Sequence, residues 1–223
     1  MNIKKIANTT LQFIIRRLIE IIGILIALIG ILLLMSLASY SPSDPNFIFP
    51  ENTEIQNILG FRGSYVSDLF FQSIGIISYL VSLTFLITGI NIFKSKDLFL
   101  IIENIFFSIF YCILGSTFLD FFYQNTFELY INGNGGFIGQ YLTQTFFGNI
   151  FSLQKIVSYY LLIILIIIFF FISINFNLKK FWDFVKNIFQ YFNKNKNKPY
   201  TNRNEIINEY IPQEEIKNLI QED

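Results

Sequence analysis

The sequence predicts an all-α integral membrane protein with four transmembrane helices and both termini in the cytoplasm. Four apolar stretches, at about residues 21–38, 69–93, 98–123 and 156–178, support this fold class. Each is long enough to cross a hydrocarbon core of about 30 Å, which needs about 20 helical residues. Charged residues make up 14% of the chain, well below the roughly one quarter of a typical soluble domain.

The basic residues predict the orientation, because lysine and arginine are kept on the cytoplasmic side during insertion. Fourteen of the sixteen basic residues precede the first stretch, separate the second from the third, or follow the fourth. They are Lys4, Lys5, Arg16, Arg17, Lys94, Lys96, Lys179, Lys180, Lys186, Lys194, Lys196, Lys198, Arg203 and Lys217. Only Arg62 and Lys155 lie on the other two connections, which are therefore expected to be external.

Residues 1–17 form a short cytoplasmic lead to a transmembrane domain that we place at 18–180. The first crossing starts near Glu20, and its apolar run of about 18 residues exceeds the 7–15 residues of a cleaved signal peptide. Gly23, Ala27 and Gly30 share one helical face. Small residues at this spacing allow close approach of a second helix, although glycine is also simply common in membrane helices.

The first external connection has two punctuated segments. The first is Ser39-Tyr40-Ser41-Pro42-Ser43-Asp44-Pro45, in which the two prolines stop the helix because they lack an N–H and restrict the residue before them. The second is Asn57-Ile58-Leu59-Gly60-Phe61-Arg62-Gly63-Ser64, in which the glycines permit a tight entry into the second crossing. We expect this connection to be a contact surface or a plain connector.

The second and third crossings are predicted to form a hairpin around the tight turn at Lys94-Ser95-Lys96-Asp97. The second carries polar residues that favour contact with other helices over contact with lipid. These are Gln72, Thr84, Thr88 and Asn91. In the third crossing, Glu103 lies near the cytoplasmic end, where we expect it to reach the interface or to pair with Lys94 or Lys96.

Short interfacial helices are predicted after the second external turn and after the last crossing. The turn at Asn132-Gly133-Asn134-Gly135-Gly136 precedes apolar residues at helical spacing over 137–150. Beyond the fourth crossing, residues 181–192 place aromatic and aliphatic side chains on one face and polar ones on the other, which predicts an amphipathic helix. Residues 193–223 are expected to be a cytoplasmic linker or tail.

The composition excludes several kinds of site. The chain has no histidine and a single cysteine, Cys112, so a disulfide within the chain, a histidine-based triad and a zinc site of the usual histidine or cysteine kind are ruled out. Cys112 lies inside an apolar stretch, where a packing role is favoured. We expect no catalytic, cofactor-binding or metal-binding residues.

Four segments resemble a known family. They are Arg16-Arg17 with Glu20 and Gly23, the Ser39–Pro45 segment, the Asn57–Ser64 segment with Asp68, and Gly135-Gly136-Phe137-Ile138-Gly139. In this order, over roughly residues 16–180, they look like the N-terminal four-transmembrane (4TM) domain of the FtsK-type bacterial DNA translocase family.

The resemblance implies a role. It implies a multi-pass protein of the bacterial inner membrane, at the division septum, that contacts the lipid bilayer and other division proteins. In the family, a linker joins this domain to a hexameric, ATP-driven motor, so the resemblance implies a homo-oligomer and contact with DNA only through an attached motor. The chain carries no Walker A motif before it ends at Asp223, so we expect it to be no enzyme but a membrane anchor and protein-interaction module that supports cell division and chromosome segregation.

Fourteen residues are candidates for structural or contact roles, with ordinary helix-end punctuation as the alternative interpretation. They are Glu20, Ser39, Tyr40, Ser41, Pro42, Asp44, Pro45, Asn57, Gly60, Gly63, Asp68, Gly135, Gly136 and Gly139. Two other functions stay open on the sequence alone. The chain could be a small polytopic transporter or channel subunit, which predicts polar groups at mid-membrane and broken helices, or it could be a truncated remnant.

Overall fold

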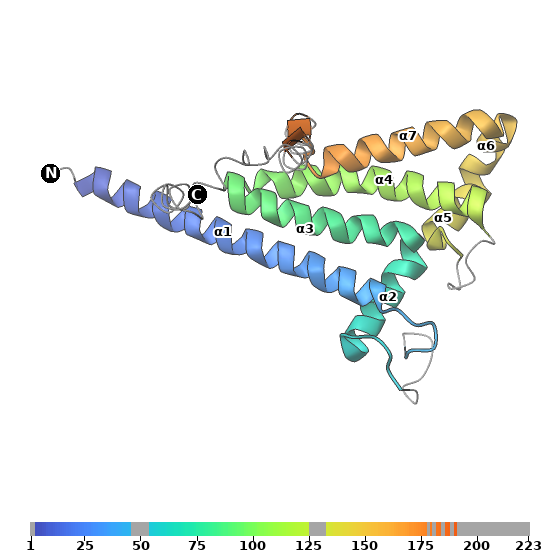
Figure 1. Cartoon of the computed structure of the whole chain (residues 1–223), viewed down its shortest axis with the longest axis horizontal. Coiled ribbons are helices and arrows are strands. Elements are labelled where there is room, and N and C mark those ends of the chain that lie inside the picture. Colours follow the sequence, from blue (N-terminus) through green and yellow to red (C-terminus); the bar gives the residue numbers. More distant parts are fainter. Residues whose placement is uncertain are drawn as a thin grey trace, which may run out of the picture. The chain divides into compact units, whose positions relative to one another are not determined.

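The computed structural model describes residues 3–45, 54–124 and 133–177, with isolated positions at 179, 182–183, 186–187 and 190. The chain divides into two compact units, Met1–Phe176 and Asn177–Asp223. Within the described ranges all regular structure is helical, and the labelled helices belong to the first unit (Figure 1). Their bounds are α1 Ile3–Ala38, α2 Gly60–Ile74, η1 Gly75–Ile77, α3 Ser78–Ser95, α4 Phe99–Tyr123, α5 Gly136–Leu142, η2 Thr143–Phe147, α6 Gly148–Leu153 and α7 Lys155–Ser173.

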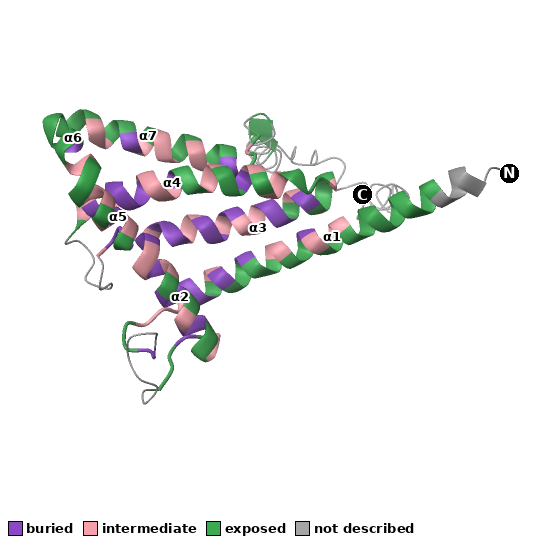
Figure 2. Ribbon diagram, turned by 180° about the vertical axis from the view of Figure 1, so that it is seen from behind, coloured by how far each residue is buried: buried purple, intermediate pink, exposed green. Residues whose placement is uncertain are grey.

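Four helical segments are long and apolar enough to cross a membrane, which confirms the predicted fold class. They are Asn8–Ala38, Gly60–Ser95, Phe99–Tyr123 and Lys155–Ser173. In Figure 1, α1, α3, α4 and α7 lie side by side in that order. The packing follows the same order, since α3 contacts both α1 and α4, and α4 contacts α7. Figure 2 shows that the buried residues of these helices lie mainly between neighbours.

Helix α1 includes most of the predicted cytoplasmic lead, because it is helical from Ile3 onward. Its 36 residues correspond to about 54 Å of helix, more than the roughly 30 Å hydrocarbon core requires. Most of its apolar side chains are exposed within the first unit. Apolar side chains that are exposed on such a long apolar helix are suited to contact lipid.

The contact between α1 and α3 runs through small residues. A Cβ atom added to Gly23 would lie 2.8 Å from both the Gly89 carbonyl oxygen and the Phe93 amide nitrogen. A Cβ atom added to Gly30 would lie 2.8 Å from Leu86 Cα. Both distances are far shorter than normal carbon contacts, so the two backbones approach closely only because side chains are missing. This confirms the helix-contact interpretation of the small-residue face on α1.

The second apolar stretch is broken rather than one continuous helix. The break follows from Gly75, whose φ of +65° suits glycine and ends α2, and a short 3₁₀ turn then leads into α3. Figure 1 shows α2 turning away from the direction of α3. The break is closed by the chain itself, because the Ile76 amide donates a hydrogen bond of 3.1 Å to the Asn134 carbonyl. Helix α3 alone spans about 27 Å, close to the thickness of a hydrocarbon core.

The turn between α3 and α4 is tight, as predicted. Lys96 adopts the left-handed conformation with φ of 62°, and its amide donates to the Ile92 carbonyl at 2.9 Å. The Asp97 carboxylate accepts the Phe99 amide at 2.9 Å and so caps the start of α4. These two devices reverse the chain within four residues.

The short helix predicted after the second external turn is present as α5, a π-helical turn (η2) and α6. Gln154, with φ of −139° and ψ of 71°, then redirects the chain into α7. For the predicted amphipathic helix over 181–192, positions 182–183, 186–187 and 190 are helical and exposed. Its other residues, and the predicted tail over 193–223, lie outside the described residues.

Candidate functional site

The Ser39–Pro45 and Asn57–Ser64 segments, which lie between α1 and the start of α2, meet through Asp44. This side chain is only 2% exposed. One of its carboxylate oxygens accepts the Gln56 amide at 2.8 Å, and the other accepts the Asn57 amide at 2.9 Å. Hydrogen bonds to an ionised carboxylate are stronger than those between neutral groups. Asp44 therefore closes the connection into a compact corner at the end of α1.

Asn57 ties this corner to α1. Its Nδ2 donates to the Ser36 carbonyl at 2.9 Å and to the Ser39 carbonyl at 3.3 Å. Its Oδ1 accepts the Leu59 amide at 3.1 Å. A Cβ atom on Gly63 would clash with this same side chain, so Gly63 has to be small for Asn57 to reach α1.

Two serines close the corner on the side of α2. Ser36 donates through its hydroxyl to the Gly63 carbonyl at 2.6 Å. Ser64 donates to the Pro45 carbonyl at 2.6 Å, and Pro45 itself is buried. Helix α2 begins at Gly60, so Ser64 lies within the helix and its hydroxyl holds the preceding loop.

The remaining candidate residues in this region differ in how far they are buried. The Tyr40 hydroxyl donates to buried Asp68 at 3.3 Å, and the Tyr40 ring packs on Phe71 with centroids 4.8 Å apart. The Ser39 hydroxyl accepts the Ile58 amide at 3.2 Å. Gly60 adopts a φ of +66°, which explains glycine at that position. By contrast, Pro42 is exposed, and half-buried Ser41 has its hydroxyl 2.8 Å from that of Ser43, while its carbonyl accepts the Asp44 amide at 3.1 Å.

In a second cluster, the glycines of the connection between α4 and α7 pack against α4 and the α2–α3 break. An added Cβ on Gly136 would lie 2.7 Å from the amide nitrogens of Ile74 and Gly75. Gly135 and Gly139 both approach the Ser116 carbonyl of α4, so neither can carry a side chain without movement of backbone atoms. The Ser116 hydroxyl in turn donates to the Ile74 carbonyl at 3.0 Å. Helix α2 therefore has the first corner at its N-terminal end and this glycine cluster at its C-terminal end.

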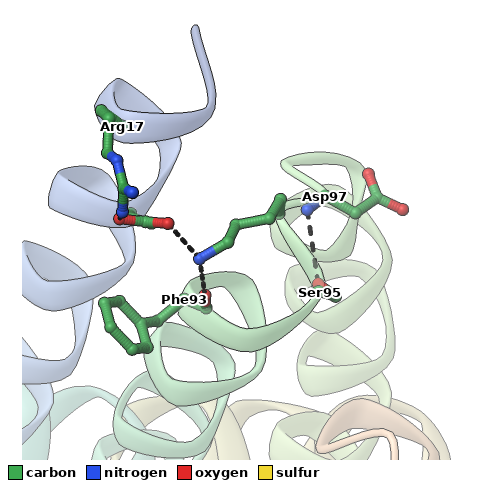
Figure 3. Close-up of polar contacts among 6 residues, drawn as sticks. Arg17, Phe93, Ser95 and Asp97 are labelled. Atoms are coloured by element: carbon green, nitrogen blue, oxygen red, sulfur yellow. Dashed lines mark hydrogen bonds and ion pairs between the residues drawn. The ribbon is translucent and has the colours of Figure 1, made fainter. Parts of the chain in front are cut away.

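Glu20 lies at the opposite end of the helices. Its carboxylate pairs with Arg17, at 2.6 Å, and with Lys96 of the α3–α4 turn. The Lys96 ammonium also donates to the Phe93 carbonyl at 2.8 Å, and Figure 3 draws the polar contacts at this end of the helices, with Arg17 and Phe93 labelled. Glu20 thus links α1 to the turn. Glu103 is expected from the sequence to reach the interface or to pair with Lys94 or Lys96, and among the ion pairs of the described chain Lys96 belongs to Glu20.

Sequence reasoning missed a buried polar cluster among α3, α4 and α7. Asn104 of α4 donates to Thr88 at 2.7 Å and accepts from Asn175 at 2.7 Å. Nearby, the hydroxyls of Thr84 and Tyr111 are 2.9 Å apart. The polarity of Thr84 and Thr88 predicts that they contact other helices, which the structure confirms. Nothing in the sequence marked Asn104 or Asn175 as members of this cluster, because their pairing depends on which helices become neighbours.

These clusters hold helices and loops together through hydrogen bonds and close backbone contacts. In the residues that the structure describes, no three histidine, cysteine, aspartate or glutamate side chains lie close enough to hold a metal ion. Thr88, Asn104 and Tyr111, which are buried among the helices, are neutral polar residues, whereas Asp68 and Asp120 are buried carboxylates. In the described residues the arrangement is a helical scaffold with two connections held against it.

Comparison with known proteins identifies the family. Residues 15–186 match the 4TM region of DNA translocase FtsK/SpoIIIE. The chain is also similar to proteins named DNA translocase FtsK from three bacteria. It is 30% identical to that of Azospirillum brasilense over 90 residues, which are 40% of this chain and 14% of that protein. It is 31% identical to that of Rickettsia bellii over 74 residues, 33% of this chain and 10% of that protein, and 31% identical to that of Caulobacter vibrioides over 75 residues, 34% of this chain and 9% of that protein.

The matched segments therefore span only a small part of these relatives. No solved structure matches the chain. The matched family region is the four-transmembrane part of the translocases and not their motor, in agreement with the four membrane-competent helices. The family match covers well over half of the sequence, and the chain belongs to the 4TM region family of the FtsK/SpoIIIE DNA translocases.

Proposed function

We propose that this chain is the membrane anchor and protein-interaction module of a division-site DNA translocase, in a bacterial inner membrane with both termini cytoplasmic. The family match and the four apolar helices support the anchor role. The distribution of basic residues supports the orientation. Translocation of DNA belongs, in this proposal, to a motor joined to the chain through the segment 193–223 or encoded separately, and a hexameric motor would bring about six copies of the anchor together.

One observation carries the interaction role, namely that the described parts of both external connections are held in place against the helices. The Asp44 carboxylate clamps one connection, and the Gly135–Gly139 segment docks the other on α4 and on the α2–α3 break. A loop that only connects two helices does not need two buried backbone clamps. A surface that must be complementary to another protein does, since preorganisation lowers the entropic cost of binding.

The buried and exposed candidates have different roles in this proposal. Asp44, Asn57 and Gly63 are buried, so they shape the corner and do not themselves reach a partner. Apolar side chains that are exposed at this end of the helices are suited to contact other division proteins. Ile58 is 71% exposed at the corner, and Leu153 is 81% exposed at the end of α6.

The experiment that tests the function is localisation in the source bacterium. A fluorescent protein fused to the chain is expected to concentrate at division sites. Asp44→Ala is expected to reduce this enrichment while the amount of fusion in the membrane, measured by immunoblot, stays unchanged. Glu54→Ala is the matched control, because Glu54 is an exposed carboxylate of the same connection. An even distribution of the unmutated fusion over the envelope would reject the proposal.

A further inference from the structure

A groove lies between α1, α2 and α3, at the end of the helices that carries the corner. It has a volume of about 330 Å³. It exists because α2 turns away from α3 at Gly75 and so leaves one side of α1 uncovered. Its walls are almost wholly apolar, with Ile29 and Leu32 on α1, Val66 and Phe70 on α2, and Phe85 on α3.

The groove runs along α1 from the helix end toward the middle of the membrane. Ser36, at its outer end, lies two residues before the last residue of α1. Ile29 lies seven residues earlier, which is about 10 Å deeper at 1.5 Å per residue. An apolar groove at this depth faces the hydrocarbon chains of the bilayer, and water finds no polar partner along most of its length.

Among the described residues that line the groove, Arg62 is the one cation, and it lies at the outer end. Arg62 lines the groove from the first turn of α2 and is exposed. It forms no ion pair with any part of the chain that the structure describes. Arg62 lines the groove beside Ser36 and Gly63, close to the end of α1. We expect phospholipid headgroups to lie at this depth. A guanidinium group binds phosphate through two parallel hydrogen bonds, so this charge is complementary to a lipid phosphate.

We propose that the groove is a phospholipid-binding site, in which one acyl chain lies along α1 between α2 and α3 and the lipid phosphate is bound by Arg62. The site takes a lipid of the leaflet that faces the corner, which is the outer leaflet of the membrane in the orientation proposed above. Charge at the mouth and an apolar groove below it match the two parts of a phospholipid in the order in which the bilayer presents them.

The test is native mass spectrometry of the full chain, purified in detergent and titrated with phosphatidylglycerol. The unmutated protein is expected to bind one lipid. Arg62→Gln is expected to weaken this binding about tenfold, the effect of losing one charge-assisted contact. Val66→Trp, which fills the groove from α2, is expected to abolish it. Lys155→Gln, which removes the other external cation, and Ile109→Trp, which adds the same bulk on the lipid-facing side of α4, are expected to bind as the unmutated chain does.

Three results would overturn the proposal. In the first, both Arg62→Gln and Val66→Trp bind lipid as tightly as the two controls. In the second, inorganic phosphate at equal concentration displaces the lipid, which would show that the acyl chain contributes nothing. In the third, a second copy occupies the groove. In the double variant Cys112→Ser and Val66→Cys, the introduced cysteine is the only thiol of the chain. A homodimer crosslinked through it in membranes would reveal such a copy.

Discussion

Asp44 shows how one buried carboxylate can organise a connection between two membrane helices. Its two oxygens accept the amides of Gln56 and Asn57, which lie twelve and thirteen residues further along the chain. Removing the carboxylate leaves both amides without these acceptors, and since Asn57 is buried, its unsatisfied donor has a large energetic cost. Neighbouring Asn57 depends on this contact, because Asp44 positions its backbone while its side chain reaches α1.

We therefore predict that Asp44→Ala lowers the free energy of unfolding by about 2–3 kcal/mol, the net value of hydrogen bonds to a charged group in a partly compensated site. Thermal unfolding of the purified chain in detergent measures the change. Glu54→Ala removes an exposed carboxylate from the same connection and is expected to change stability by less than about 0.5 kcal/mol. Equal effects of the two substitutions would contradict the role assigned to Asp44.

At the scale of elements, the contact between α1 and α3 relies on missing side chains. Gly89 of α3 lies against α1, and a Cβ atom there would be 2.8 Å from Ala27 Cα. Van der Waals packing is the main attraction between helices in lipid, because the surrounding acyl chains are as apolar as leucine. A side chain at this position forces the two helices apart and removes that packing along their length.

Gly89→Val is accordingly predicted to destabilise the domain by about 1–3 kcal/mol, the usual cost of overpacking. The midpoint of unfolding in a mild detergent provides the measurement. Ile90→Ala, one position along on the exposed side of α3, serves as the control and is expected to have a small effect, because lipid or detergent fills the space it leaves. A midpoint unchanged by Gly89→Val would show that the seam is looser than the structure indicates.

The polar cluster joins three helices in a different way. Thr88 of α3 accepts a hydrogen bond from Asn104 of α4, and Asn104 accepts one from Asn175 at the end of α7. A double-mutant cycle of Thr88→Val and Asn104→Leu is predicted to give a coupling energy of about 0.6 kcal/mol, and at most about 1.7 kcal/mol, as for other hydrogen bonds between membrane helices. A parallel cycle of Thr88→Val and Ser36→Ala, at opposite ends of the helices, should be additive. Coupling in both cycles would mean that the substitutions act through a general loosening.

For the whole molecule, much of the architecture could be predicted from the sequence because lipid imposes strong rules. Stretch length gives the crossings, and the spacing of Gly23, Ala27 and Gly30 gives the face on which α1 meets its neighbour. The break at Gly75 could not be predicted, because its apolar flanks are typical of a continuous helix and because the Ile76 amide after the break donates to the carbonyl of the distant Asn134. The partners of Asn104 and Lys96 were also hidden, since each depends on which helices become neighbours.

The site shows the same division. Turn residues such as Asp44, Gly60 and Gly135 could be recognised by residue type, because glycine, proline and aspartate are favoured in turns and at helix ends. That Asp44 and Asn57 would be buried together, while Pro42 stays exposed and Ser41 half-buried, depends on how the loop closes over α1 and α2. The groove beside Arg62 was invisible for a related reason, since it results from the angle that α2 takes after the break.

Orientation is the property of the whole molecule on which the division of its surfaces depends. The basic residues predict that the end with Glu20 and Lys96 is cytoplasmic and that the corner and the glycine cluster are external. Alkaline phosphatase, which is active only outside the cytoplasm, is therefore expected to be active when inserted after Thr126 and inactive when fused after Asp223. A green fluorescent protein moved between the same two positions should give the opposite pattern, because it fluoresces only when it folds in the cytoplasm, and this exchange controls for expression. Phosphatase activity after Asp223, with no fluorescence there, would show that the orientation is inverted. Arg62 would then lie at the inner leaflet, and the two connections would face the cytoplasm, away from any partner on the outer side of the membrane.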